Sequence, residues 1–252
     1  MYNLGISTVL AVIAAALTAF LLTPVAGIIP GVAVWGLSFF LISRRVGVEV
    51  QKEMAALEPL VQQRKIPELK ARIEKMKTEW GPWQPLLMGQ LDAQLGMIDY
   101  LQMKWEVALP ALERGKWRNW MITVCIGLVH FRKKRTEEAF QNLADAAWVA
   151  PKEPMVYVVH AVVLQRTGKR DEALKVLADG LKSIPDSDLL KALQTTIANK
   201  KKIDVATFPQ SWFQFFPEDA LKAMNMRGRK GGPMPGAGFP QPKVSRKARR
   251  GR

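Results

Sequence analysis

Residues 1–43 contain no charged side chain, and this absence divides the chain into two parts with different surroundings. From Arg44 onward charged residues are dense and mostly basic, and the whole chain carries a formal net charge of +15. An uncharged stretch of this length suits lipid, whereas a basic body favours contact with something anionic, such as lipid headgroups, a nucleic acid or an acidic protein. Charge alone does not choose among these partners.

Residues that carry out catalysis or hold metals are also scarce. The single cysteine, Cys125, excludes an intramolecular disulfide and lies in an apolar run that favours packing in a core. The two histidines, His130 and His160, have no other ligands near them at the spacing of a metal site. The sequence has no phosphate-binding glycine loop, nucleophile elbow or paired-cysteine motif. It therefore predicts a protein that is not an enzyme, with no catalytic residue, no cofactor and no metal.

The uncharged stretch is too long to cross a bilayer once. A hydrocarbon core of ~30 Å takes about 20 helical residues. We therefore expect a transmembrane hairpin in residues 1–43, with helices at about 4–22 and 25–42, a breaker-rich connection around Thr23-Pro24, and an end at Arg44-Arg45. A cleaved signal peptide is the alternative, but no Lys or Arg precedes the apolar run and no small-residue cleavage site ends it.

The basic residues after the hairpin predict its orientation. Positive charge accumulates on the cytoplasmic side of membranes, so both termini and the whole body are expected in the cytoplasm, with the hairpin integral to the inner (plasma) membrane. Small residues favour close pairing of the two helices: Ala11, Ala15 and Ala19 share one stripe, and Gly27 and Gly31 are one turn apart. The alternative is that these residues only fill apolar helices.

Residues from Gly47 to Lys202 show helical spacing of apolar residues and no long strand-like alternation. A period of 34 residues separates three pairs of similar residues, namely Pro151 and Pro185, Ala139 and Ala173, and Gly127 and Ala161. Such a period is typical of stacked helical repeats.

The segment from Pro154 to Pro185 resembles a tetratricopeptide repeat. The matching positions are Tyr157, Ala161, the turn glycine Gly168, Ala173, Leu177, Gly180-Leu181 and the closing Pro185. The unit before it matches through Gly127, Ala139, Leu143, Ala146 and Pro151, with Lys134 in place of the turn glycine, and a weaker unit uses Leu95-Gly96, Ala108 and Leu112.

The resemblance implies an all-α fold in which the hairpin is followed by a short, right-handed array of helical repeats. The array is expected in residues 89–202, with repeats at about 89–119, 120–153 and 154–187 and a capping helix from Leu189 to Lys200. Residues 44–88 are expected to form amphipathic helices that read as a degenerate repeat. Small residues would let paired helices approach, and bulky residues would fill the gaps between neighbours.

By the same resemblance, the first helix of each repeat lines a groove that binds a segment of a partner protein. The groove residues are then Met97, Tyr100, Met121, Val124, Leu128, Phe131, Arg132, Met155, Val158, Val162 and Arg166. Most are apolar, so the expected ligand is an amphipathic or apolar segment. Arg132 and Arg166 lie 34 residues apart at the rim, where they either pair with acidic groups of the ligand or are simply exposed arginines near turns.

Residues 203–226 hold an aromatic segment, with five aromatic residues between Phe208 and Phe216, followed by a short helix that starts at Pro217-Glu218-Asp219. Because exposed aromatic residues are costly, the segment either folds back on the array, docks in a membrane interface or binds a partner. Residues 227–252 contain nine Lys or Arg and no acid, which predicts a disordered basic tail able to contact anionic lipid or, nonspecifically, nucleic acid.

Together these features predict a membrane-anchored adaptor or scaffold that binds a partner protein. One alternative is a membrane tether for nucleic acid or the ribosome, acting through the basic tail. Another is a structural subunit of a membrane complex, with the hairpin as its contact. The sequence does not identify the partner or the oligomeric state.

Overall fold

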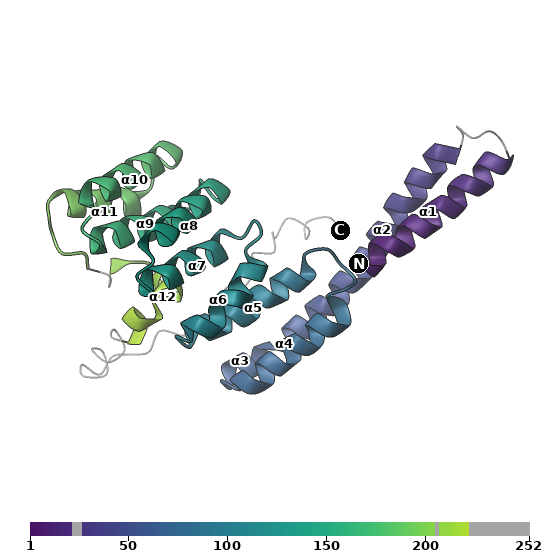
Figure 1. The fold of residues 1–252 in the computed structure, drawn as a ribbon, viewed down its shortest axis with the longest axis horizontal. Coiled ribbons are helices and arrows are strands. Elements are labelled where there is room, and N and C mark those ends of the chain that lie inside the picture. The colour runs from purple at the N-terminus through teal and green to yellow at the C-terminus, as the bar shows by residue number, and fades with distance from the viewer. Residues whose placement is uncertain (22–26, 205–206, 222–252) are drawn as a thin grey trace, which may run out of the picture.

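The computed structural model describes residues 1–21, 27–204 and 207–221, and these residues form helices with no strands. The helices are α1 (Tyr2–Leu21), α2 (Ile28–Ala55), α3 (Glu58–Gln62), α4 (Ile66–Trp80), α5 (Leu87–Leu101), α6 (Trp105–Gly115), α7 (Trp120–Arg132), α8 (Thr136–Val149), α9 (Pro154–Arg166), α10 (Arg170–Ser183), α11 (Asp188–Ala198) and α12 (Trp212–Phe215). The hairpin of α1 and α2 projects from one end of a stack formed by the later helices (Figure 1). The predicted all-α fold is confirmed, whereas the connection at Thr23-Pro24 and the tail 227–252 lie outside the described residues.

The two helices of the hairpin meet through the small residues that the sequence singled out. A Cβ atom placed on Gly27 would lie 2.5 Å from the carbonyl oxygen of Ala15 and 3.2 Å from Cβ of Ala19. One placed on Gly31 would lie 3.0 Å from Cβ of Ala15 and 3.3 Å from the carbonyl oxygen of Ala11. The backbones therefore approach too closely for larger side chains at these positions.

The outer surface of the hairpin is apolar. Large side chains such as Phe20 and Ile29 are 89% and 78% exposed, and α1 and the helical stretch that begins with α2 are long and apolar enough to cross a membrane. An apolar surface of this extent is unfavourable in water.

Helix α2 does not end at the predicted boundary near Ile42 but continues to Ala55. Arg44 and Arg45 end the uncharged stretch without ending the helix, because arginine is a good helix former and its charge requires only that the side chain reach a polar environment. One continuous helix thus connects the apolar hairpin to the charged body.

The base of the hairpin is fixed against the loop between α4 and α5. The backbone N–H of Tyr2 donates to the carbonyl oxygen of Pro82 at 2.8 Å, and the ring of Tyr2 meets that of Trp83 edge-on at 5.6 Å. The side-chain amide of Gln84 donates to the carbonyl oxygen of Ser43 at 2.7 Å, and that of Asn3 donates to the Ser43 hydroxyl at 2.7 Å.

The body contains three helix pairs, α5/α6, α7/α8 and α9/α10, followed by α11 (Figure 1). Helices α7 and α9 begin at Trp120 and Pro154, and α8 and α10 begin at Thr136 and Arg170, so both helices of the last two pairs repeat after 34 residues. The structure therefore has the repeat-like packing of adjacent helices that the sequence period predicts.

Small residues allow close contact inside each pair. A Cβ atom on Gly127 would lie 3.2 Å from Cγ of Leu143, and one on Gly180 would lie 2.7 Å from the ring of Tyr157. Leu143 is completely buried and Tyr157 is nearly so. These bulky side chains occupy the space that the glycines leave, as expected from the pattern of small and large residues.

The turns within the pairs share one backbone conformation. Each has a residue with positive φ at the same place, namely Met103 (60°), Lys134 (60°) and Gly168 (82°). In each turn this residue donates its N–H to the carbonyl three residues earlier, and the next residue donates to the carbonyl five residues earlier. Arg64 after α3 and Lys200 after α11 have the same conformation, with φ of 55° and 54°.

Buried acids on α5 join α4 to the array. The carboxylate of Asp92 on α5 accepts from Lys77 of α4 at 2.9 Å and from Arg114 of α6 at 3.1 Å. Burial alone would raise the pKa of Asp92, but the hydrogen bonds from Arg114 and Lys77 outweigh burial and lower it. A second buried acid, Asp99, pairs with Lys70 of α4.

Candidate peptide-binding face

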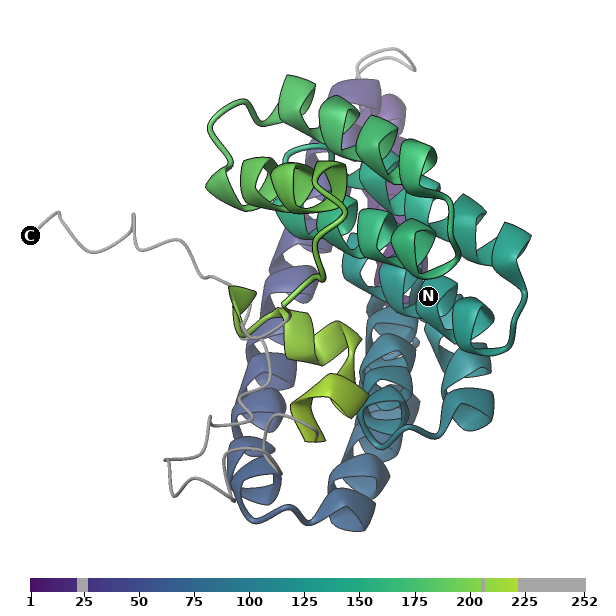
Figure 2. The same ribbon diagram turned by 90° about the vertical axis from the view of Figure 1, so that its left-hand side faces the viewer.

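Residues 207–221 fold back onto the array, and we call them the docked segment (Figure 2). Its aromatic side chains Trp212, Phe215 and Phe216 are 0%, 1% and 1% exposed and belong to the same apolar core as α7 and α9. Among the alternatives for the aromatic segment, the structure therefore shows folding back on the array. The segment includes α12 and a second helical turn that begins at Pro217.

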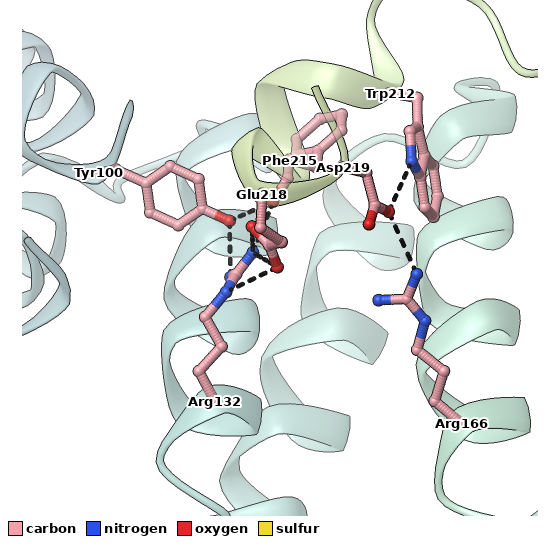
Figure 3. Close-up of polar contacts among 7 residues, drawn as sticks. All are labelled: Tyr100, Arg132, Arg166, Trp212, Phe215, Glu218 and Asp219. Atoms are coloured by element: carbon pink, nitrogen blue, oxygen red, sulfur yellow. Dashed lines mark hydrogen bonds and ion pairs between the residues drawn. The ribbon is translucent and has the colours of Figure 1, made fainter. Parts of the chain in front are cut away.

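The guanidinium of Arg132, in the last turn of α7, contacts both a side chain and a backbone carbonyl of the docked segment (Figure 3). Its Nη2 donates to the two carboxylate oxygens of Glu218 at 2.7 and 2.9 Å and to the carbonyl oxygen of Phe215 at 3.0 Å. Its Nη1 donates to the hydroxyl of Tyr100 at 2.9 Å, and that hydroxyl donates to the same carbonyl of Phe215 at 2.5 Å. Forked recognition of this kind is specific to arginine.

Aromatic rings surround this arginine. The guanidinium carbon of Arg132 lies 4.2 Å from the centre of the Trp105 ring, and its side chain is only 13% exposed. The ring of Phe215 lies 6.0 Å from that of Trp120, at the start of α7. The charge of Arg132 is therefore shielded from water by neighbouring rings, which strengthens its pairing with Glu218.

Arg166 makes the equivalent contact one repeat later. Its Nη2 donates to Oδ2 of Asp219 at 3.2 Å, and the indole N–H of Trp212 donates to the same oxygen at 3.3 Å (Figure 3). The guanidinium carbon of Arg166 lies 4.6 Å from the centre of the Phe216 ring, which stacks on Trp212 at 4.2 Å. The Asp219 side chain is 9% exposed and that of Arg166 is 35% exposed, so this pair is open on the arginine side.

Burial sets the protonation of Tyr100 and Cys125, which belong to the core of the array. It raises the pKa of Tyr100 well above the usual value, so the hydroxyl keeps the proton that it donates to Phe215. Burial also raises the pKa of the Cys125 thiol to about 12. Cys125 therefore stays a neutral, packed thiol, and neither group is suited to act as a nucleophile at neutral pH.

Three of the eleven predicted groove residues contact the docked segment through hydrogen bonds or ion pairs: Tyr100, Arg132 and Arg166. Five others are buried in the core: Val124, Leu128, Met155, Val158 and Val162. The remaining three are partly buried and pack against that core: Met97, Met121 and Phe131. We use the name docking face for Tyr100, Trp120, Arg132 and Arg166, which contact the docked segment, together with Trp105, whose ring packs on Tyr100 and Arg132.

Sequence reasoning missed Trp105 and Trp120 as part of the docking face and did not match the two arginines to Glu218 and Asp219. Trp105 lies on the second helix of its pair, which the repeat resemblance does not place in the groove. A signal for the ion pairs was present, since two arginines at equivalent repeat positions are matched by two adjacent acids after an aromatic run.

Comparison with known proteins gives no family for this chain. No protein-family model matches the chain, and a search of the curated proteins found no match. The function is therefore inferred from the chain's own residues.

Proposed function

We propose that the protein is a membrane-anchored adaptor whose helical-repeat array binds a segment of a partner protein on the docking face. The observation that carries this proposal is that the docking face already holds a peptide segment, the chain's own residues 207–221, by aromatic burial and two arginine–carboxylate pairs. The resemblance to tetratricopeptide repeats supports the proposal, because arrays of that family bind peptides through the first helices of their repeats.

The contacts of the docked segment support one chemistry for the proposed ligand. Arg132 and Arg166 lie 34 residues apart and each takes a carboxylate, while the apolar side of the segment buries three aromatic rings. A partner segment that replaces it would carry large aromatic side chains followed by acids. This refines the apolar or amphipathic ligand expected from the sequence by adding negative charge.

Replacement of the docked segment is an exchange between two ligands for one face. A segment tethered to its own site acts at an effective concentration of roughly millimolar for a short flexible connection. A partner must therefore bind more tightly than an isolated copy of residues 207–221 would, or must be concentrated at the same membrane. The hairpin supplies the second condition, because it confines the array to a surface.

The membrane part of the proposal has its own support. Two apolar helices with an exposed apolar surface begin the chain, and the basic residues that follow favour an array on the cytoplasmic side of the inner (plasma) membrane. In this arrangement α2 fixes the position of the body relative to the hairpin, since this one helix runs from the hairpin into the body.

Peptide binding in trans tests the docking face. The full chain in detergent, with Trp212→Ala and Phe216→Ala to release the docked segment, should bind a fluorescent synthetic peptide of residues 207–221. Adding Arg132→Glu should abolish binding, whereas Arg135→Glu, which changes an exposed arginine three residues away, should not. Equal binding by both would refute the docking face.

Partner capture tests the adaptor role. Crosslinked complexes purified from membranes should contain a partner whose recovery rises when the docked segment is released and falls when the peptide is added as competitor. A peptide with lysine in place of Glu218 and Asp219 is the matched control and should not compete. If neither peptide changes the recovery of the partner, the partner does not bind through the docking face.

A structural subunit of a membrane complex is the second candidate, and one observation favours it. A shallow apolar groove runs along the hairpin and is lined by Ala11, Ala15, Gly31 and Trp35, among others. Small residues beside such a groove let another membrane helix approach. Replacing Val32, an exposed residue that lines the same groove, by Phe should then remove a co-purifying membrane protein without changing peptide binding by the array.

A further inference from the structure

We infer that one edge of the repeat array lies on the membrane surface, with the exposed rings of Trp117 and Trp148 in the headgroup region of a bilayer that contains anionic lipid. This inference rests on the membrane-spanning hairpin of the proposed function but not on the docking face. We call this edge the membrane edge and define it by the loops 81–86, 116–119 and 150–153.

The antiparallel helices of the array place its turns on two opposite edges. The turns inside the pairs α5/α6, α7/α8 and α9/α10 lie on one edge, and the loops that lead from α4, α6 and α8 to the next helix lie on the other. In Figure 1, α6, α8 and α10 run in the direction in which the hairpin extends from its base, so their ends lie on the side toward the hairpin.

The first loop of the membrane edge is attached to the base of the hairpin. Pro82 accepts from the backbone N–H of Tyr2 at 2.8 Å, and Gln84 donates to the carbonyl oxygen of Ser43 at 2.7 Å. Ser43 is the last residue before the first charges of the chain, at Arg44 and Arg45. The loop 81–86 therefore lies at the depth where the apolar hairpin gives way to polar surroundings, which is the level of the headgroups.

The membrane edge is marked by exposed tryptophan. Trp117, in the loop after α6, is 60% exposed, and Trp148, in the last turn of α8, is 85% exposed. The other tryptophans of the body within the described residues are buried or partly buried: Trp80, Trp83, Trp105, Trp120 and Trp212. Leu86 and Met88, beside the first loop, add exposed apolar surface, at 47% and 44%.

Tryptophan fits a membrane interface because its ring is apolar while its N–H finds partners among headgroups. Basic residues accompany both rings: Lys116 and Arg118 flank Trp117, with the guanidinium of Arg118 5.7 Å from the ring centre, and Lys152 follows Trp148. These charges attract anionic lipid.

The opposite edge of the array shows which feature of the membrane edge points to a lipid surface. Its turns are also basic, with Lys104, Lys134 and Lys169, but no tryptophan is exposed there in the described structure. Basic charge alone therefore does not distinguish the two edges, whereas tryptophan does. The combination of exposed tryptophan, basic neighbours and attachment to the hairpin base fits a lipid surface.

Depth-dependent quenching tests the inference on the full chain. Single cysteines at Lys116, Lys152 and Lys134 would be labelled with an environment-sensitive fluorophore, because the native Cys125 is completely buried. The protein is then placed in vesicles of phosphatidylcholine and phosphatidylglycerol with quencher-bearing lipids. Labels at 116 and 152 should be quenched several-fold more than the label at 134, and equal quenching at all three would overturn the inference.

Two further variants separate this inference from the hairpin itself. A label at Val12, on the outer surface of α1, reports insertion of the hairpin. Strong quenching at 12 with none at 116 and 152 would overturn the membrane edge alone, whereas no quenching at 12 would overturn the membrane anchor as well. Replacing Trp117 and Trp148 with glutamate should remove the quenching at 116 and 152 and leave that at 12, and unchanged quenching at 116 and 152 would also overturn the inference.

Discussion

Replacing Arg132 with glutamine should make the docked segment open more often while leaving the array folded. The substitution removes a charged, two-oxygen contact with Glu218 and a hydrogen bond to the carbonyl of Phe215. Hydrogen bonds to charged groups contribute about 1.5–3 kcal/mol each, but the Glu218 side chain is 32% exposed and regains water when it is freed. We therefore expect a loss of about 2–3 kcal/mol in the docking free energy, which is roughly a 30- to 150-fold rise in the open population.

Native-state hydrogen exchange measures that population directly. The amides of Phe216 and Asp219 donate to the carbonyl oxygens of Trp212 and Phe216 at 3.1 and 3.0 Å and become free only when the docked segment opens. Their exchange should accelerate by the stated factor in the Arg132→Gln protein. Amides in α9 and α10 should keep their protection, because these helices are packed independently of Glu218.

A second arginine provides the control. Arg135→Gln changes an exposed residue in the neighbouring turn and should leave the exchange of the docked segment unchanged. A cycle with Glu218→Gln isolates the pair itself, and the two substitutions together should cost less than the sum of their separate effects by about 1–2 kcal/mol. If the amides of the docked segment exchange at the wild-type rate in Arg132→Gln, the assignment of Arg132 as its main polar anchor is wrong.

Three other predictions follow from the fold. Burial lowers the pKa of His160 to about 4, so the folded protein binds a proton at this residue more weakly than the unfolded chain does. The contribution of His160 to stability is therefore full above about pH 6.5 and falls by up to about 3 kcal/mol as the pH drops to 4. His160→Gln should flatten this dependence of stability on pH in denaturant titrations. Gly31→Leu should separate the hairpin helices, as measured by crosslinking, whereas Gly36→Leu should not, because no atom lies within 4 Å of a Cβ at Gly36. Lys134→Gly should stabilise the array by about 0.5–1 kcal/mol and Gly168→Ala should destabilise it by about 1 kcal/mol in thermal melts, because both positions have positive φ.

The architecture was predictable where one physical constraint dominates. Absence of charge over 43 residues predicted the hairpin, and small residues at fixed spacing predicted the contacts of Gly27 and Gly31 with α1. The 34-residue period predicted the pairing of α7 to α10. The end of α2 was not predictable from charge. Arg44 and Arg45 require a polar environment for their side chains, but arginine favours a helical backbone and so does not end the helix.

The docking face was harder to predict because it depends on contacts between distant parts of the chain. Arg132 and Arg166 were recognised as a pair, yet their partners lie 86 and 53 residues further along the chain. The pattern of residues within one repeat does not indicate which distant residues will contact it. Val124 and Val158, which the same pattern places on the groove, are completely buried in the apolar cluster that also contains Trp212, Phe215 and Phe216.

The geometry of the two ion pairs also specifies the conformation that a competing ligand must adopt. Glu218 and Asp219 are adjacent in sequence, but they pair with arginines on different helices, α7 and α9. Successive side chains of an extended strand point to opposite faces, whereas those of a helix diverge by about 100° and can both reach the same array. Residues 217–221 are helical, and Pro217 begins this turn with a backbone angle that suits it. A partner segment that engages both arginines should therefore be helical at its acids, so a peptide in which Pro217 is retained should compete better than one with glycine at that position.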